Sequence, residues 1–282
     1  MRLRDSCGGK DVKQKMTKCD KCQCSAIIYQ RYSGMHLCRE HFEDDVHRKI
    51  REGLRKTGLF GPGSRIAVGL DGGRKSATLA FVLKNLFIHR RDIDLLAIII
   101  DEGKKTSPTA DQAAHVAEQL GMAYIVKSQP LLQDLETPHT VQSARKRELL
   151  LAAAKENQAR ILATGETLDD EARDIFISYL QGDVDAVVRE GSLREEQSVA
   201  WIKPLRRIPE KEVRLYAIGR HLGFDDAGEM PNTAALRRVA KRLLCDFDCR
   251  HPGTNYSLLR GLEKVRHMKG PTRAKPLSKD GK

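Results

Sequence analysis

The chain has 282 residues, which is enough for one medium catalytic domain with small appendages. Hydrophobic residues make up 40% and charged residues 31%, which is typical of a soluble globular protein. No apolar run predicts a membrane span, and the first residues lack the apolar core of a signal peptide. We therefore expect a cytoplasmic protein. The net charge of +12 favours a polyanionic partner such as a nucleic acid, the alternative being a basic protein with a solvated surface. An aromatic content of 5% argues against an aromatic stacking platform.

The first 18 residues are polar and without period, so we expect a flexible tail. Two ligand pairs follow, Cys19-x-x-Cys22 and Cys38-x-x-His41. Each spacing lets two side chains converge on one ion from a tight turn, and two such pairs complete a tetrahedral site. The sequence therefore predicts structural zinc, the alternative being four coincidental residues in a reducing compartment.

The zinc ligands and a linker helix form one predicted segment, residues 19–60. Val46, Ile50 and Leu54 recur every four residues, which indicates one face of a helix. Gly61-Pro62-Gly63 then breaks the chain and predicts a domain boundary.

Residues 61–190 alternate between apolar strands and helical patterns, which predicts an α/β fold with a parallel sheet covered on both faces. Ligands of such sheets bind at the carboxyl ends of the strands. The expected strands end near Leu70, Asp101, Val126 and Gly165, with the expected helices over 76–88, 111–121, 145–157 and 169–183.

Residues 191–268 are predicted to be helical. Pro209 suits the first turn of one helix, and a second over 234–247 is basic. Three- and four-residue spacing puts its cations on one face that could follow an RNA backbone, against the alternative of a solvated basic face. The RNA-binding candidates are Arg237, Arg238, Lys241 and Arg242. The polar stretch 269–282 is expected to be disordered.

The strand ending at Leu70 runs into a glycine turn and a helix start. Gly72 and Gly73 let the backbone approach a phosphate, and the helix N-terminus near Ser76 can bind the anion, with Arg74 and Lys75 as cations. A merely structural turn is the alternative.

Several stretches together carry a family resemblance. DGGRKS at 71–76 is similar to the S-G-G-K-D-S loop of the PP-loop proteins, and TGETLDDEA from Thr164 is similar to their T-G-H-N-L-D-D-E-A. PLRRIPEKEV from Pro204 and HPGTNYSLLRGLEK from His251 resemble segments of the TtuA-like branch. With the zinc pairs, the chain resembles TtuA-like tRNA 2-thiolation proteins of the PP-loop ATPase superfamily over roughly residues 19–266.

The resemblance implies a Rossmann-like PP-loop domain that binds ATP, adenylates a tRNA uridine and replaces its C2 oxygen with sulfur. It implies nucleotide contacts for Gly165 and Asp169 and catalytic roles for Lys146 and Asp170, with Asp170 holding Mg²⁺ or moving a proton. The alternative is a surface lysine and ordinary acids at a helix start.

The sequence departs from the family pattern at its sulfur ligands and its loop. The expected cysteines are replaced by His139, Gln142 and Met230, so we expect no iron–sulfur cluster. Asp71 replaces the serine of the loop and Lys75 its acid, which leaves ATP and Mg²⁺ binding open.

Three functions stay open. The chain is an ATP-dependent tRNA modifier that uses another nucleophile, as lysidine synthases do, a non-catalytic tRNA-binding derivative, or a sulfur transferase served by another subunit. tRNA is the expected partner, with a homodimer or an active paralogue as further candidates.

Overall fold

The computed structural model describes most of the chain and divides it into two compact units, unit 1 (Met1–Asp44) and unit 2 (Asp45–Lys282). The described residues are 17–101, 110–128, 139–183, 195–196, 199–222 and 235–269. The expected tails at 1–18 and 269–282 lie outside them except for their innermost residues, as does Met230.

Unit 1 is built on a small antiparallel hairpin. Strand β1 (Ile28–Gln30) pairs with β2 (Met35–Leu37), and Gly34 closes the turn with a φ of +70°, a conformation that favours glycine. Helix α1 (Arg39–Thr57) starts in unit 1 directly after β2 and continues into unit 2. Along α1, Val46, Ile50 and Leu54 are buried, which confirms the predicted apolar face.

Unit 2 contains a six-stranded sheet in the order β5-β4-β3-β6-β8-β7. All neighbouring pairs are parallel except β7 and β8, which are antiparallel. The strands are β3 (Ser64–Gly69), β4 (Ile93–Asp101), β5 (Ala123–Ser128), β6 (Ile161–Ala163), β7 (Glu195–Glu196) and β8 (Val199–Ile202). Central β6 is wholly buried, and β3 is buried except for exposed Arg65 and half-buried Gly69, as expected of apolar strands covered on both faces.

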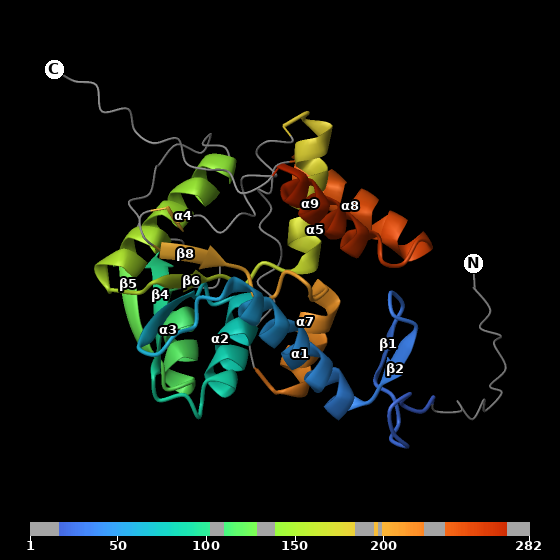
Figure 1. Cartoon of the computed structure of the whole chain (residues 1–282), viewed down its shortest axis with the longest axis horizontal. Helices are drawn as coiled ribbons and strands as arrows, with labels where there is room; N and C mark the ends of the chain where they lie inside the picture. Colours follow the sequence, from blue (N-terminus) through green and yellow to red (C-terminus); the bar gives the residue numbers. More distant parts are fainter. Residues whose placement is uncertain are drawn as a thin grey trace, which may run out of the picture. The chain divides into compact units, whose positions relative to one another are not determined.

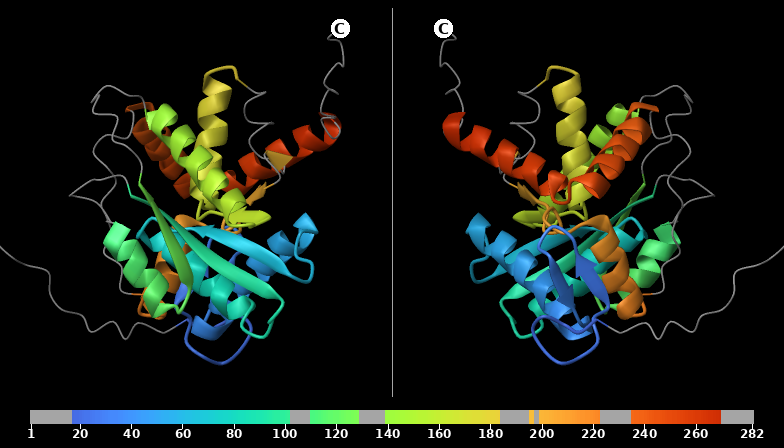
Figure 2. Two further views of the ribbon diagram at one scale, coloured as in Figure 1. Left: turned by 90° about the vertical axis from the view of Figure 1, so that its left-hand side faces the viewer. Right: turned by 90° about the vertical axis from the view of Figure 1, so that its right-hand side faces the viewer.

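Helices cover both faces of this sheet (Figures 1 and 2). One face carries α4, which contacts β4, β6 and β8, and the other carries α2 and α3, with α7 packed on α2. The covering helices are α2 (Arg74–Leu86), α3 (Ala110–Gln119), α4 (His139–Glu156) and α7 (Glu210–Gly219). The predicted α/β class with a parallel sheet is confirmed.

Three further helices pack together beside the carboxyl ends of the strands (Figure 1). They are α5 (Leu168–Leu180), α8 (Ala235–Arg250) and α9 (Thr254–Lys269). Buried Leu168 and Ile175 of α5 meet Leu259 and Leu262 of α9 in a small apolar cluster of their own. This cluster fixes α9 against the helix that follows β6.

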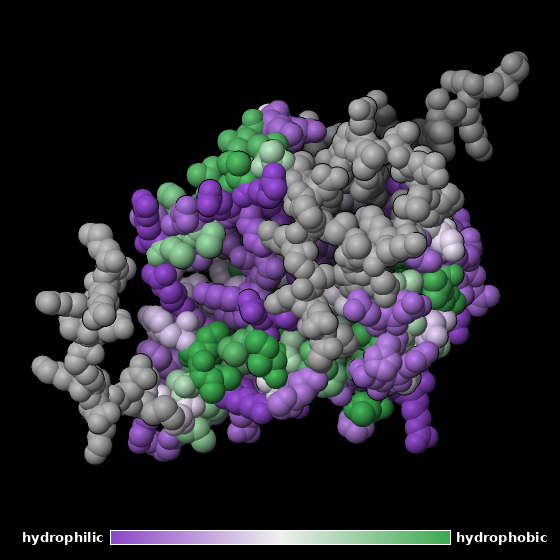
Figure 3. Space-filling model, turned by 180° about the vertical axis from the view of Figure 1, so that it is seen from behind, coloured by the Kyte–Doolittle hydropathy of each residue, from purple (hydrophilic) through white to green (hydrophobic). Residues whose placement is uncertain are grey.

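Seen from behind, the described part of the surface is mostly hydrophilic, with separate hydrophobic patches (Figure 3). Within the described residues, no helix has the length and apolar character needed to cross a bilayer.

Candidate functional site

The loop between β3 and α2 forms a strand-to-helix turn at the carboxyl edge of the sheet. Gly72 adopts a φ of +76°, in the left-handed region that glycine tolerates at no steric cost. Gly73 is the N-cap of α2, and Ser76 is buried in its first turn. The first N–H groups of α2 have no helical partner, so this end of the helix can bind an anion.

A carboxylate of the chain itself lies in this turn. Oδ1 of Asp71 accepts a hydrogen bond from the N–H of Gly73 at 2.9 Å and another from the hydroxyl of Ser76. The N–H of Asp71 donates in turn to Ser76 Oγ at 3.3 Å. An anionic group of the protein therefore uses donors of the loop that a phosphate would use.

The loop after β6 lies directly against the loop after β3. Residues 66–68 of β3 pair in parallel with residues 161–163 of β6, so the two strands end side by side. A Cβ on Gly165 would lie 3.0 Å from the backbone nitrogen of Ser76 and 3.1 Å from the carbonyl carbon of Lys75. Any larger residue would push the loops apart, and the structure thus brings Gly165 together with the predicted loop residues.

Asp170, in the first turn of α5, joins the two loops electrostatically. Its Oδ2 accepts from Lys75 Nζ at 2.8 Å and from the N–H and hydroxyl of Thr167 at 3.0 and 2.8 Å, while Oδ1 accepts from Arg173 Nη2 at 3.0 Å. Burial alone would raise the pKa of Asp170, but Lys75 and Arg173 outweigh it and lower that pKa. Asp170 is thus held ionised with both oxygens occupied, a poor state for accepting a proton.

The ion pair with Asp170 also controls the pKa of Lys75. Burial works to lower its pKa, but the charge of Asp170 prevails and raises it. Its side chain is 38% exposed, so the ion pair with Asp170 is only partly shielded from solvent.

Asp169 makes contacts of a different kind. Its Oδ2 accepts the N–H of Glu210 at 2.6 Å, at the start of α7, and its Oδ1 accepts from Asn255 Nδ2 of α9 at 3.3 Å. Burial raises the pKa of Asp169. These contacts tie α5 to two later helices, and a contact of Asp169 with nucleotide remains a prediction.

Lys146 lies partly buried on α4, one residue before Arg147. The Arg147 guanidinium lies 4.5 Å from the ring centroid of Trp201 on β8, and Lys203 Nζ lies 4.6 Å from the same centroid. The indole N–H of Trp201 donates to Thr164 Oγ1 at 2.6 Å. The structure thereby links this part of α4 to the ends of β6 and β8, and the catalytic role of Lys146 stays a prediction.

Sequence reasoning missed Glu166, which follows Gly165 directly. Its Oε2 is buried and has no hydrogen-bond partner among the residues that the structure describes. Burial raises the pKa of this carboxyl, against the opposing effect of Lys203. Its position just after a parallel strand, where ligands of such sheets bind, was the available signal.

The four RNA-binding candidates on α8 fall into two stripes. Arg237 Nη2 lies 2.7 Å from Asp174 Oδ1, Lys241 Nζ lies 3.4 Å from Glu210 Oε2, and both of these residues are half-buried. Arg238 and Arg242 are exposed and one helical turn apart. The exposed pair is therefore the better candidate for contact with a polyanion.

In unit 1 the predicted metal ligands converge. One donor atom each from Cys19, Cys22, Cys38 and His41 lies within 4.8 Å of all the others. Cys22 Sγ and Cys38 Sγ are 3.7 Å apart, and His41 Nδ1 is 3.3 Å from Cys38 Sγ and 3.6 Å from Cys19 Sγ. Zinc–sulfur bonds of about 2.3 Å in a tetrahedron place sulfurs roughly 3.8 Å apart, so the cluster fits zinc.

The environment of Cys19 favours its thiolate. Burial opposes the charged form, but the N–H groups of Cys38 and Lys21 donate to its sulfur, and its pKa falls to about 6. A thiolate is the form that binds metal.

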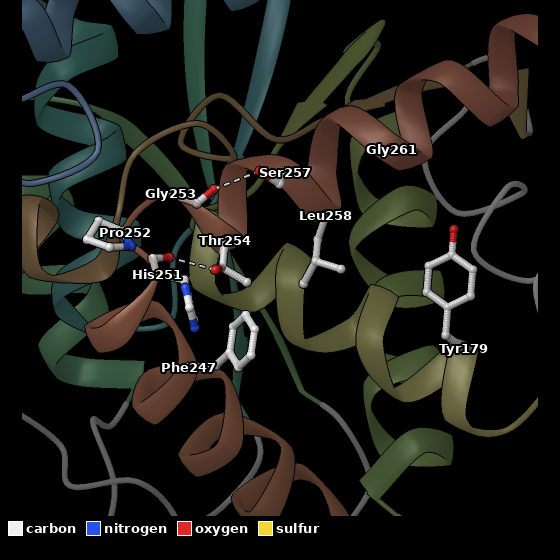
Figure 4. Close-up of a pocket in the computed structure, with 9 residues that line it drawn as sticks. All are labelled: Tyr179, Phe247, His251, Pro252, Gly253, Thr254, Ser257, Leu258 and Gly261. Atoms are coloured by element: carbon white, nitrogen blue, oxygen red, sulfur yellow. Dashed lines mark hydrogen bonds between the residues drawn. The ribbon is translucent and has the colours of Figure 1, made fainter.

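A hollow of about 440 Å³ lies between α5, α8 and α9 (Figure 4). The rings of Phe247 and His251 lie 4.6 Å apart at its wall. The hydroxyls of Thr254 and Ser257 donate to backbone carbonyls of His251 and Gly253 at 2.7 and 3.1 Å, so they are satisfied within the chain. The lining is accordingly more apolar than its residue types suggest.

Comparison with known families matches most of the chain. The model of the 2-thiouridine synthetase TtuA N-terminal LIM domain matches residues 18–43, and the PP-loop domain model matches residues 42–233. These two ranges contain the four-ligand cluster and the loop over 71–76.

Individual relatives agree with this assignment. The chain is 29% identical to the tRNA 2-thiolation protein NcsA of Haloferax volcanii, over 89% of this chain and 87% of that protein. It is 30% identical to the cytoplasmic tRNA 2-thiolation protein 1 of Caenorhabditis briggsae, over 86% and 70%. The structure of the U34-tRNA thiolase NcsA from Methanococcus maripaludis superposes with a TM-score of 0.81 at 28% identity, covering 93% of this chain and 89% of that one.

The same structure corrects one expectation. It contains a [4Fe-4S] cluster, so our prediction that a chain of this kind has none is wrong. That prediction used residue identities at His139, Gln142 and Met230, but cluster ligands are defined by convergence in space, and Met230 lies outside the described residues.

Among the described residues of unit 2, the thiols that could serve such a group are on α8. Cys245 and Cys249 are exposed and four residues apart, so they lie one turn from each other. Burial and the neighbouring Cys249 raise the pKa of Cys245. Iron–sulfur clusters are held by cysteine thiolates, usually four, so these two thiols alone do not make a complete ligand set.

Proposed function

The chain belongs to the PP-loop family of tRNA 2-thiolation proteins, and from this premise we propose that it binds tRNA and uses ATP at residues 71–76 to activate a base for thiolation. The observation that supports this most is the contact between the two strand-end loops, where Gly165 leaves room for the start of α2. We propose a cytoplasmic location by analogy with relatives of that description.

The residues of the loop would bind and orient the nucleotide. The first N–H groups of α2 face the phosphates, and Lys75, held by Asp170, adds a positive charge at the same edge. The C2 oxygen of the base attacks the α-phosphorus and pyrophosphate leaves. A sulfur nucleophile then attacks C2, the C2–O bond breaks, and AMP leaves with the former C2 oxygen.

We expect the protein to catalyse exchange between pyrophosphate and ATP when tRNA is added, because adenylation of the base is reversible. The measurement is transfer of labelled pyrophosphate into ATP, with and without bulk tRNA. Gly165→Ala should abolish the exchange, since its Cβ would lie 3.0 Å from Ser76 N. Gly53→Ala, where nothing lies within 4 Å of the added Cβ, is the matched control.

A second function, tRNA binding without catalysis, is favoured by the carboxylate of Asp71 on the loop donors. The two functions differ in one result. A protein that binds tRNA but shows no exchange under any condition supports the binding function and contradicts the catalytic one.

Reversing the charges of Arg238 and Arg242 should weaken tRNA binding by about tenfold or more at low salt, because exposed cations on one helix face release counterions from phosphates. The double variant Arg238→Glu and Arg242→Glu should also flatten the dependence of affinity on salt, by about one unit of slope for each phosphate that the protein no longer neutralises.

The control for this double variant is Arg51→Glu with Arg55→Glu. These residues are also exposed and one turn apart, on α1, and the net charge changes equally. Equal losses of affinity from both double variants would mean that bulk charge alone drives binding. Absence of tRNA binding by the wild-type protein at low salt would contradict the proposed function.

A further inference from the structure

Two side chains of the loop over residues 71–76, the phosphate loop, carry opposite charges, and each has hydrogen-bond partners within the protein. Asp71, whose residue is exposed, places one carboxylate oxygen on the N–H of Gly73 and the hydroxyl of Ser76. Lys75, at the start of α2, places its ammonium 2.8 Å from Oδ2 of Asp170, in the first turn of α5. An internal anion and an internal cation thus stand four residues apart in one turn.

The carboxylate opposite Lys75 has little capacity left for a metal ion. Asp170 accepts four hydrogen bonds, from Lys75, Arg173 and both donors of Thr167. Its side chain is 9% exposed, so water cannot readily replace these donors. To bind Asp170, a divalent cation would have to displace the ammonium of Lys75. That ammonium already supplies the positive charge that balances the carboxylate.

The hydrogen bonds that hold the Asp71 carboxylate in the loop are easier to break than those of Asp170. Asp71 is held by two hydrogen bonds that arise within six residues of chain, and its exposed position lets the side chain turn to solvent without opening a cavity. A phosphate could take over both donors once the carboxylate turns away. If the carboxylate stayed, it would repel the phosphate at short range.

We propose that this loop takes a nucleotide without a divalent cation, with Lys75 as the fixed counter-charge and with Asp71 as an internal competitor that the phosphate displaces. This inference rests on the proposed function, because it assigns to the same loop the form of nucleotide that it accepts. Lys75 is a binding residue in this arrangement, and Asp170 is the positioning residue that orients it.

The test is calorimetric titration of the full-length protein with ATP, in excess Mg²⁺ and in EDTA. The wild-type protein should bind ATP with an affinity that differs by less than about threefold between the two conditions. Asp71→Ser should bind ATP about tenfold more tightly or better in both, because the competing charge is gone while a hydroxyl remains. A gain of affinity cannot arise from misfolding.

Lys75→Met should lose about tenfold or more of the affinity in EDTA, while Mg²⁺ should recover part of the loss. Lys84→Met, on the same helix with its ammonium 3.0 Å from Gly121 O, makes the same change away from the loop and should leave binding unchanged. Thermal melting of both variants shows whether the fold is kept, and Asp71→Ser decides the matter if Lys75→Met does not fold.

Wild-type binding that disappears in EDTA would overturn the inference and leave the proposed function standing. An Asp71→Ser protein that binds no more tightly than wild type would overturn it also. If neither protein binds ATP in either condition, both the inference and the ATP-dependent function are overturned.

Discussion

The variant Cys38→Ser is expected to lose zinc and the fold of unit 1 together. Serine is a poor zinc ligand, and structural zinc in small domains contributes roughly 10–16 kcal/mol of apparent binding energy that is also folding energy. Within residues 17–44, the part of unit 1 that the structure describes, few apolar side chains are buried, chiefly Leu37 and Phe42. Metal analysis should give about one zinc per wild-type chain and almost none in the variant.

The matched control is Cys24→Ser, which removes an exposed thiol outside the four-ligand cluster. It should keep its zinc and resist proteolysis within residues 17–44 as the wild type does. Equal zinc content in Cys38→Ser and wild type would contradict the predicted Cys3His site. Zinc loss in Cys24→Ser alone would mean that Cys24, and not Cys38, is a zinc ligand.

The second large effect is expected for Asp170→Asn, which should destabilise unit 2 by about 3 kcal/mol at neutral pH. The amide leaves Lys75 and Arg173 without their shared anion and weakens the bonds to Thr167 at the start of α5. We take the lower end of the range for a broken buried pair because the Lys75 side chain is 38% exposed. Urea unfolding of both proteins measures the difference.

The difference should depend on pH in one direction. The pKa of Asp170 is lowered in the folded protein, so its contribution is complete above the ordinary aspartate pKa and is lost as pH falls through the folded value. The two proteins should therefore converge in stability as the pH falls below about 4. Asp94→Asn, which breaks the exposed pair with Arg65, should cost about 1 kcal/mol or less. A gap for Asp170→Asn no larger than this control would contradict the assigned role.

Much of the fold could be predicted from local pattern. The break at Gly61-Pro62-Gly63 directly precedes β3, Pro209 caps α7, and the basic segment predicted over 234–247 is α8. These assignments depend on periodicity, turn residues and fixed backbone angles, which are properties of neighbouring residues.

The site was predictable as a set of positions but not as a set of contacts. Lys75 and Asp170 are 95 residues apart, and their pairing depends on β6 lying beside β3, which no local pattern specifies. The same reason explains why Asp169 and Asp170 diverge: adjacent in sequence, they project from the start of α5 toward different partners. Glu166 was missed because its burial follows from the tertiary fold alone.

The central place of β3 in the sheet has a kinetic consequence. It pairs on one side with β4, about thirty residues later, and on the other with β6, nearly a hundred residues later. During synthesis, the second edge of β3 must wait until residue 163 has left the ribosome, since parallel neighbours joined by long connections form slowly. The loop over residues 71–76 lies where β3 and β6 end side by side. A nascent chain can therefore complete this site only after β6 has been synthesised. Chains cut short before β6 would expose an unpaired apolar strand edge and should aggregate.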